Sequence, residues 1–207
     1  MHKLNLIRSG LDAKEADKAL VMLHGRGGRA EDFLGLVDEL EVEGFAIVAP
    51  QANHNTWYPY SFMAPISQNE PFLTSALEML KEVVDNLISL GITEDRIYFV
   101  GFSQGACLTL EFVARNAKKY GGVAAFTGGL IGDQIYKDNY SGDFHQTPIF
   151  IGTGDPDPHV PVERIYASVE TLEGLSASVT TKVYPGRPHT ISTDELNLVN
   201  QLIFSVR

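Results

Sequence analysis

A serine lies between two glycines in Gly101-Phe102-Ser103-Gln104-Gly105. The stretch before it, Arg96-Ile97-Tyr98-Phe99-Val100, is rich in the aromatic and β-branched residues that favour a strand, and the apolar run after it favours a helix. Glycines two positions before and after the serine suit a tight strand-to-helix turn, because a Cβ at either place would strike a neighbouring element. The pattern predicts an elbow with Ser103 exposed at its tip.

Other apolar runs predict further strands of the same sheet. Uninterrupted apolar strands are typical of a parallel sheet that is buried on both faces. Such runs cover residues 19–23, 45–50, 123–126 and 147–152, and edge strands are expected at residues 4–7 and 179–184. Helices are expected over residues 31–41, 72–90, 106–115, 162–172 and 190–206. The alternation predicts an α/β fold, with a mainly parallel sheet of about seven strands and helices on both faces.

Composition and charge limit the class of protein. A chain of 207 residues with 44% hydrophobic residues suits one globular domain, expected to span residues 1–207. The formal net charge of -10 and the lack of a Lys/Arg cluster disfavour a nucleic-acid partner. Charges interrupt the N-terminus and no apolar run is long enough to span a bilayer, so we expect a cytoplasmic protein without membrane insertion. The single cysteine, Cys107, agrees with a reducing compartment and is expected to be buried packing.

A glycine-rich loop, His24-Gly25-Arg26-Gly27-Gly28, follows the predicted strand at residues 19–23. It lacks the spacing of a dinucleotide-binding site or a P-loop. Glycines at such a place let the backbone approach a substrate and direct an N–H toward it, which favours an oxyanion loop. His24 itself is expected to be a hydrogen-bonded structural residue rather than a base.

The elbow serine needs a base and an acid, because a neutral hydroxyl is a poor nucleophile. His189 lies between the last predicted strand and the terminal helix, and Asp155 and Asp157 lie in a proline-rich loop after residues 147–152. The order Ser103, Asp157, His189 is that of many serine hydrolases, with every residue on a loop that follows a strand. On these grounds alone Asp155 remains a competing acid.

The segment over residues 51–71, called the roof segment below, is too apolar for a solvated loop and too interrupted by proline for one helix. Such a segment either caps a core or covers a pocket, and we expect the second because long loops in compact domains are usually functional. The candidate substrate-binding residues in and beyond it are Trp57, Tyr58, Phe62, Met63, Leu130 and Ile131.

Together these motifs resemble the phospholipase/carboxylesterase group of α/β-hydrolases, which includes the acyl-protein thioesterases. The resemblance covers nearly the whole chain. It rests on Leu23-His24-Gly25-Arg26-Gly27, Trp57-Tyr58, the Ser103 elbow, Asp157-Pro158-His159-Val160-Pro161 and Gly186-Arg187-Pro188-His189. It implies an α/β-hydrolase fold.

The resemblance also implies roles for individual residues. Ser103 would be the nucleophile, His189 the base and Asp157 the orienting acid, since only Asp157 has the proline four residues later that the family's loop has. The backbone N–H groups of Arg26 and Gln104 would form the oxyanion hole. The implied enzyme is a serine carboxylesterase acting through an acyl-enzyme on small-molecule esters or thioesters of short to medium acyl groups, often as a homodimer. It would use no cofactor and no metal, and the sequence contains no metal-binding motif.

Other functions remain open at this level. A thioesterase or a lysophospholipase would use the same machinery, and an inactive hydrolase fold kept as a binding module is an alternative from another class. The chain departs from the family's pattern at Pro59, at Arg26 and at Arg187-Pro188. One hypothesis is that Arg26 and Arg187 flank the mouth and attract an anionic substrate, the alternative being that both are solvated.

Overall fold

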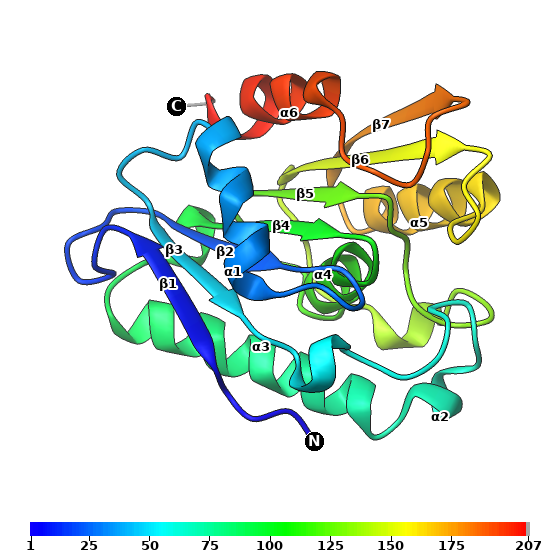
Figure 1. The fold of residues 1–207 in the computed structure, drawn as a ribbon, viewed down its shortest axis with the longest axis horizontal. Helices are drawn as coiled ribbons and strands as arrows, with labels where there is room; N and C mark the ends of the chain where they lie inside the picture. The colour runs from blue at the N-terminus through cyan, green and yellow to red at the C-terminus, as the bar shows by residue number, and fades with distance from the viewer. Residues whose placement is uncertain (206–207) are drawn as a thin grey trace.

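Seven strands form one sheet in the computed structural model, which describes residues 1–205 (Figure 1). The strands are β1 (Leu6–Gly10), β2 (Ala19–Leu23), β3 (Ala46–Pro50), β4 (Ile97–Phe102), β5 (Gly122–Phe126), β6 (Pro148–Asp155) and β7 (Ser178–Pro185). Their order across the sheet is β1-β3-β2-β4-β5-β6-β7, and all neighbours run parallel except β1 and β3. The predicted α/β architecture is confirmed.

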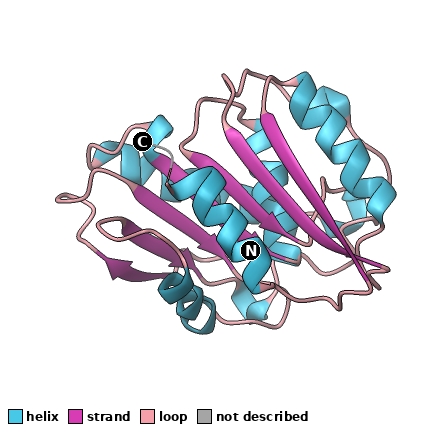
Figure 2. Ribbon diagram, turned by 90° about the horizontal axis from the view of Figure 1, so that it is seen from above, coloured by secondary structure: helices cyan, strands magenta, loops and turns pink. Residues whose placement is uncertain are grey.

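Helices cover both faces of the sheet (Figure 2). One face carries α3 (Phe72–Ser89), α4 (Gln104–Arg115) and α5 (Val162–Gly174), and the other carries α1 (Ala30–Phe33) and α6 (Thr193–Val199). Because side chains alternate along a strand, Val21 points toward the face that α3, α4 and α5 cover, and Met22 toward the face that α1 and α6 cover. The central strands are therefore buried on both faces, which explains why they are continuous apolar runs.

Two helices differ from the prediction. The helix expected at residues 31–41 is split into α1 and a 3₁₀ helix, Leu34–Glu39. Gly35 disfavours a continuous α-helix, and the tighter turn still packs apolar side chains such as Leu36 against the core. The terminal helix begins at Thr193, because Ser192 and Glu195 form a capping box. It continues as a π-helical turn over Asn200–Phe204, and its predicted end at Val206 lies outside the described residues.

Short helical turns lie in the connections, at Asn53–Asn55, Ile66–Asn69 (α2), Glu94–Arg96 and Lys137–Asn139. The first two belong to the roof segment. The loops that follow β2, β4, β6 and β7 leave the carboxyl edge of the sheet, where parallel sheets assemble their sites. None of the helices within residues 1–205 combines the length and the apolar character needed to cross a membrane.

Candidate active site

The turn between β4 and α4 holds Ser103 in a strained conformation. Its backbone has φ 53° and ψ -118°, a region that L-residues rarely adopt. A Cβ on Gly101 would lie 2.6 Å from the carbonyl oxygen of Gly105, and a Cβ on Gly105 would overlap the carbonyl oxygen of Leu23. Gly101 is therefore needed for β4 to pack against α4, and Gly105 for α4 to pack against β2.

Ser103, His189 and Asp157 form a continuous line of hydrogen bonds. His189 Nε2 lies 2.8 Å from Ser103 Oγ, and His189 Nδ1 lies 2.8 Å from Asp157 Oδ2. With its proton on Nδ1, the ring donates to the carboxylate and leaves Nε2 to accept from the hydroxyl. The His189 side chain is 20% exposed and that of Asp157 is fully buried. This arrangement lets His189 take the serine proton.

Asp157, and not Asp155, contacts His189. The Asp157 Oδ1 atom accepts the backbone N–H groups of His159 at 2.8 Å and Val160 at 2.9 Å. Burial by itself would raise the pKa of Asp157, but these hydrogen bonds and the one from His189 outweigh it and lower the pKa below the ordinary 3.8. The carboxylate is therefore ionised at neutral pH. Asp155 is exposed at the end of β6.

The backbone N–H groups of Arg26 and Gln104 lie close to Ser103 in the chain or in space. Arg26 follows Gly25, which packs against the serine: a Cβ on Gly25 would lie 3.4 Å from Ser103 Cβ. Gln104 is the first residue of α4, so its N–H has no acceptor within the helix. Within residues 1–205, neither the Arg26 N–H nor the Gln104 N–H has a backbone acceptor. Both groups are free to donate to a substrate oxygen.

The Gln104 side chain ties the roof segment to the elbow. Its Oε1 accepts the N–H of Trp57 at 2.9 Å, and its Nε2 donates to the carbonyl of Tyr58 at 2.7 Å. The amide is buried, so both contacts are made away from water. Sequence reasoning missed this role, and the polar residue beside the serine at the start of an apolar helix is the signal that would have found it.

The side chains of Arg26 and Arg187, near the site, make different kinds of contact within the protein. The Arg26 guanidinium donates to the carbonyls of Pro59 at 2.9 Å and Tyr60 at 2.6 Å. Arg187 is paired with the fully buried carboxylate of Glu195, and its own side chain is only 10% exposed. Arg187 is therefore not a free charge at a mouth. Arg26 holds the roof segment, but its side chain is exposed, and the neutral carbonyls that it contacts leave its positive charge in place. The hypothesis that these charges attract an anionic substrate therefore loses Arg187, and Arg26 remains its candidate.

His24 is a structural residue, as predicted from the sequence. Its ring is buried, with Nδ1 2.7 Å from the carbonyl oxygen of Gly25, and Nε2 accepts the N–H of Ala52 at 3.2 Å. Burial lowers the pKa of His24 below the ordinary 6.5, so the ring is neutral at pH 7. The indole N–H of Trp57 donates to the His24 carbonyl at 2.8 Å, which links the glycine-rich loop to the roof segment.

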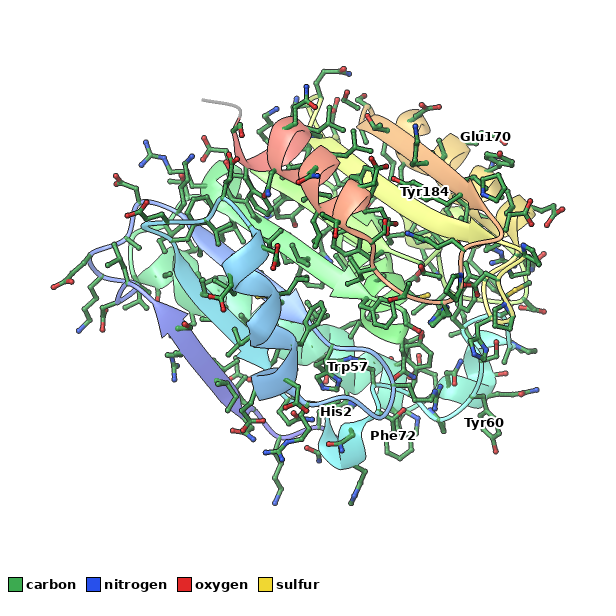
Figure 3. All side chains as sticks on the ribbon, turned by 45° about the horizontal axis from the view of Figure 1, so that its top comes forward. His2, Trp57, Tyr60, Phe72, Glu170 and Tyr184 are labelled. Atoms are coloured by element: carbon green, nitrogen blue, oxygen red, sulfur yellow. The ribbon has the colours of Figure 1, made fainter. Side chains whose placement is uncertain are left out.

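A cavity of about 500 Å³ opens beside Ser103. Of the candidate substrate-binding residues, Tyr58 and Phe62 line it. The other four do not: Trp57, Leu130 and Ile131 are fully buried, and Met63 is half-buried against the core. In Figure 3, Trp57 lies inside the molecule near His2, whereas Tyr60 points outward at the surface. Direct substrate contact is therefore not expected of these four residues.

The loop after β6 supplies a cavity wall that sequence reasoning missed. Pro158, His159 and Val160 line the cavity, and the His159 ring centroid lies 5.1 Å from that of His189. Their closeness in the chain to Asp157 is the signal that would have found them. Cys107 also borders the cavity, but burial raises the pKa of its thiol to about 12, so the sulfur stays protonated.

The chain matches a model of the phospholipase/carboxylesterase family over residues 8–206. It is similar to the crystal structure of a phospholipase/carboxylesterase from Dyadobacter fermentans, with 58% identity, a TM-score of 0.98 and coverage of 99% of this chain and 98% of that one. Esterase PE8 shares the fold, with a TM-score of 0.84 at 22% identity and full coverage of both chains.

Two curated relatives are similar over part of their length. A probable carboxylesterase SOBER1-like from Arabidopsis thaliana is 33% identical over 129 residues, which is 62% of this chain and 49% of that protein. Acyl-protein thioesterase 1 from Gibberella zeae is 32% identical over 136 residues, which is 63% of this chain and 58% of that protein. The matched part of the chain thus spans roughly half of these relatives.

Proposed function

Because this chain belongs to the phospholipase/carboxylesterase family of hydrolases, we propose that it is a serine carboxylesterase that uses Ser103, His189 and Asp157 as its triad. Support comes above all from the two hydrogen bonds of 2.8 Å that join these three side chains across the carboxyl edge of the sheet. The proposed substrates are small esters of short to medium acyl chains.

In the proposed reaction, His189 Nε2 takes the hydroxyl proton while Ser103 Oγ attacks the ester carbonyl. The N–H groups of Arg26 and Gln104 donate to the oxyanion that forms. His189 then gives its proton to the leaving alcohol, and an acyl-enzyme remains on Ser103. A water molecule repeats the sequence and releases the acid, while Asp157 orients the ring and stabilises its cation. The reaction so written needs no metal and no cofactor.

Thioester hydrolysis is a second candidate, favoured by the similarity to acyl-protein thioesterase 1 of Gibberella zeae. The same nucleophile and oxyanion donors would serve it, because only the leaving atom changes from oxygen to sulfur. The cavity of about 500 Å³ is of the size that small-molecule sites have. Measuring kcat/KM for an ester and a thioester of the same acyl group separates the two candidates, because the higher value identifies the preferred leaving group.

The decisive experiment is labelling with a fluorophosphonate probe together with hydrolysis of p-nitrophenyl esters from acetate to dodecanoate. We expect Ser103→Ala to lose labelling and to lower kcat at least about 10³-fold. The matched control is Ser89→Ala, since Ser89 is exposed on α3 and its hydroxyl donates only to the Asn86 carbonyl at 2.7 Å. A wild-type protein that neither labels nor turns over any ester would instead support a binding module.

Three further expectations belong to the same proposal. We propose that residues 1–207 form a single domain, that the protein assembles as a homodimer and that it resides in the cytoplasm. A single domain should unfold in one cooperative transition, and a homodimer should sediment with the mass of two chains. Cell fractionation tests the location.

A further inference from the structure

Leu130 and Ile131 lie in a buried segment, residues 129–132, between two charged side chains that are themselves buried. Glu111 comes from α4, the helix that begins after Ser103, and is 0% exposed. Arg164 comes from α5, the helix that follows the Asp157 loop, and is 8% exposed. Buried charges are costly unless fully paired, so their contacts identify what they hold in place.

The two charges hold opposite kinds of backbone group. The Glu111 carboxylate accepts the N–H of Ile131 at 3.0 Å, and its other oxygen accepts from Arg115 at 2.7 Å. The Arg164 guanidinium donates to the carbonyls of Gly132 at 2.8 Å and Leu130 at 3.3 Å. An anion on one N–H group and a cation on two carbonyl groups give charge-assisted hydrogen bonds that orient the peptides of this segment.

The clamped segment in turn holds the cavity wall. Gly132 N–H donates to the carbonyl of Phe62 at 2.7 Å. The Phe62 ring packs beside Gly129, since a Cβ on Gly129 would lie 3.6 Å from Phe62 Cε2. Phe62 lines the cavity next to Ser103. Its backbone and its ring are thus both placed by residues 129–132.

We propose that Glu111 and Arg164 are positioning residues which, through residues 129–132, fix the Phe62 wall of the cavity and so set which acyl chains fit. Neither charge touches the substrate, and the effect is transmitted through the Phe62 carbonyl and ring. This inference rests on the proposed esterase function. It also gives Leu130 and Ile131, which do not line the cavity, an indirect part in substrate choice.

Two hydroxyls on α5 provide a matched pair for the test. Ser168 Oγ donates to the Arg164 carbonyl at 2.7 Å, and Thr171 Oγ1 donates to the Ala167 carbonyl at 2.9 Å. Only Ser168 also accepts the N–H of Leu130, at 2.9 Å. Ser168→Ala therefore loosens the clamped segment, whereas Thr171→Val removes a comparable hydroxyl without touching it.

The experiment measures kcat and KM for p-nitrophenyl acetate and p-nitrophenyl octanoate, which share one leaving group. We expect Arg164→Met to lower kcat/KM for octanoate about tenfold through KM and to leave acetate within about twofold. Ser168→Ala should lower the ratio of kcat/KM for octanoate to kcat/KM for acetate by about threefold, and Thr171→Val should leave this ratio unchanged. If Arg164→Met does not fold, Ser168→Ala carries the test.

A double-mutant cycle then asks whether the effect passes through Phe62. We expect Phe62→Ala to lower kcat/KM for octanoate, and Arg164→Met to lower it little further in that background, since the ring that Arg164 helps to place is then absent. Additive effects, or equal losses on both esters, would overturn the inference while leaving the esterase intact. A wild-type protein inactive on both esters would overturn the proposed function instead.

Discussion

Two aspartates, one at the end of β6 and one two residues later on the loop that follows it, differ in what their side chains contact. Asp157 holds His189 Nδ1, whereas Asp155 is exposed. We predict that Asp157→Asn lowers kcat by about 10³- to 10⁴-fold, because an amide cannot stabilise the imidazolium and favours the wrong tautomer. Asp155→Asn should stay within about threefold. Steady-state kinetics on one ester decide the matter, and equal losses in the two variants would count against the assignment of the acid.

His24 makes the stability of the fold depend on pH. Its pKa is lowered by burial, so below the ordinary 6.5 the unfolded chain binds a proton that the folded chain resists. The free energy of unfolding should therefore be fully retained above pH 6.5 and fall as the pH drops below that value. Urea unfolding at about pH 7.5 and about pH 5.5 should show this loss, and His24→Gln should show less of it. A loss of equal size in both proteins would exclude His24 as its source.

Which single residues could be predicted from the sequence depends on whether chemistry or burial decides their role. Ser103, Asp157 and His189 could be proposed because each follows a predicted strand in the order of a serine hydrolase, and the family resemblance favoured Asp157 over Asp155. Trp57 and Leu130 were wrongly predicted to bind substrate, because an apolar side chain near a catalytic loop looks the same in the sequence whether it lines the cavity or supports it. Only the packed structure shows that both are fully buried.

At the scale of the elements, the contact between α4 and β2 depends on a residue without a side chain. A Cβ on Gly105 would overlap the Leu23 carbonyl, so we predict that Gly105→Ala lowers the free energy of unfolding by about 3 kcal/mol or more. Gly174 ends α5, where a Cβ would meet no atom of another described residue within 4 Å. Gly174→Ala should therefore stabilise the fold by about 0.5 to 1 kcal/mol. Thermal unfolding of the pair tests this, and similar melting temperatures would contradict it.

The strands and the three long helices, α3, α4 and α5, were predictable from the sequence to within about three residues, and the helix predicted at residues 31–41 was not. Strands buried on both faces must be apolar throughout, which leaves an unambiguous run such as residues 19–23. The segment at residues 31–41 keeps its helical spacing in a 3₁₀ helix as well, because both kinds of helix turn one apolar side to the sheet. Spacing alone therefore does not distinguish the two.

For the whole molecule, the net charge of -10 acts on any charged substrate before contact. Arg187 does not offset it at the site, because Glu195 neutralises its charge, and the single charge of Arg26 is small beside the net charge. We predict that kcat/KM for a succinate monoester rises as salt increases from about 10 mM to about 500 mM, while a neutral ester of similar size is unaffected. A value of kcat/KM for the anionic ester that instead falls with salt would support the hypothesis that Arg26 attracts the substrate.

The backbone of Ser103, at φ 53° and ψ -118°, sets yield against turnover at a single position. Glycine adopts that conformation without strain, so Ser103→Gly would fold more favourably and lose the proposed nucleophile at the same time. A library ranked by the amount of folded protein would therefore enrich the variant that does no chemistry. Selections on this scaffold therefore need to measure the product formed, because a screen that measures only the amount of folded protein would select against Ser103.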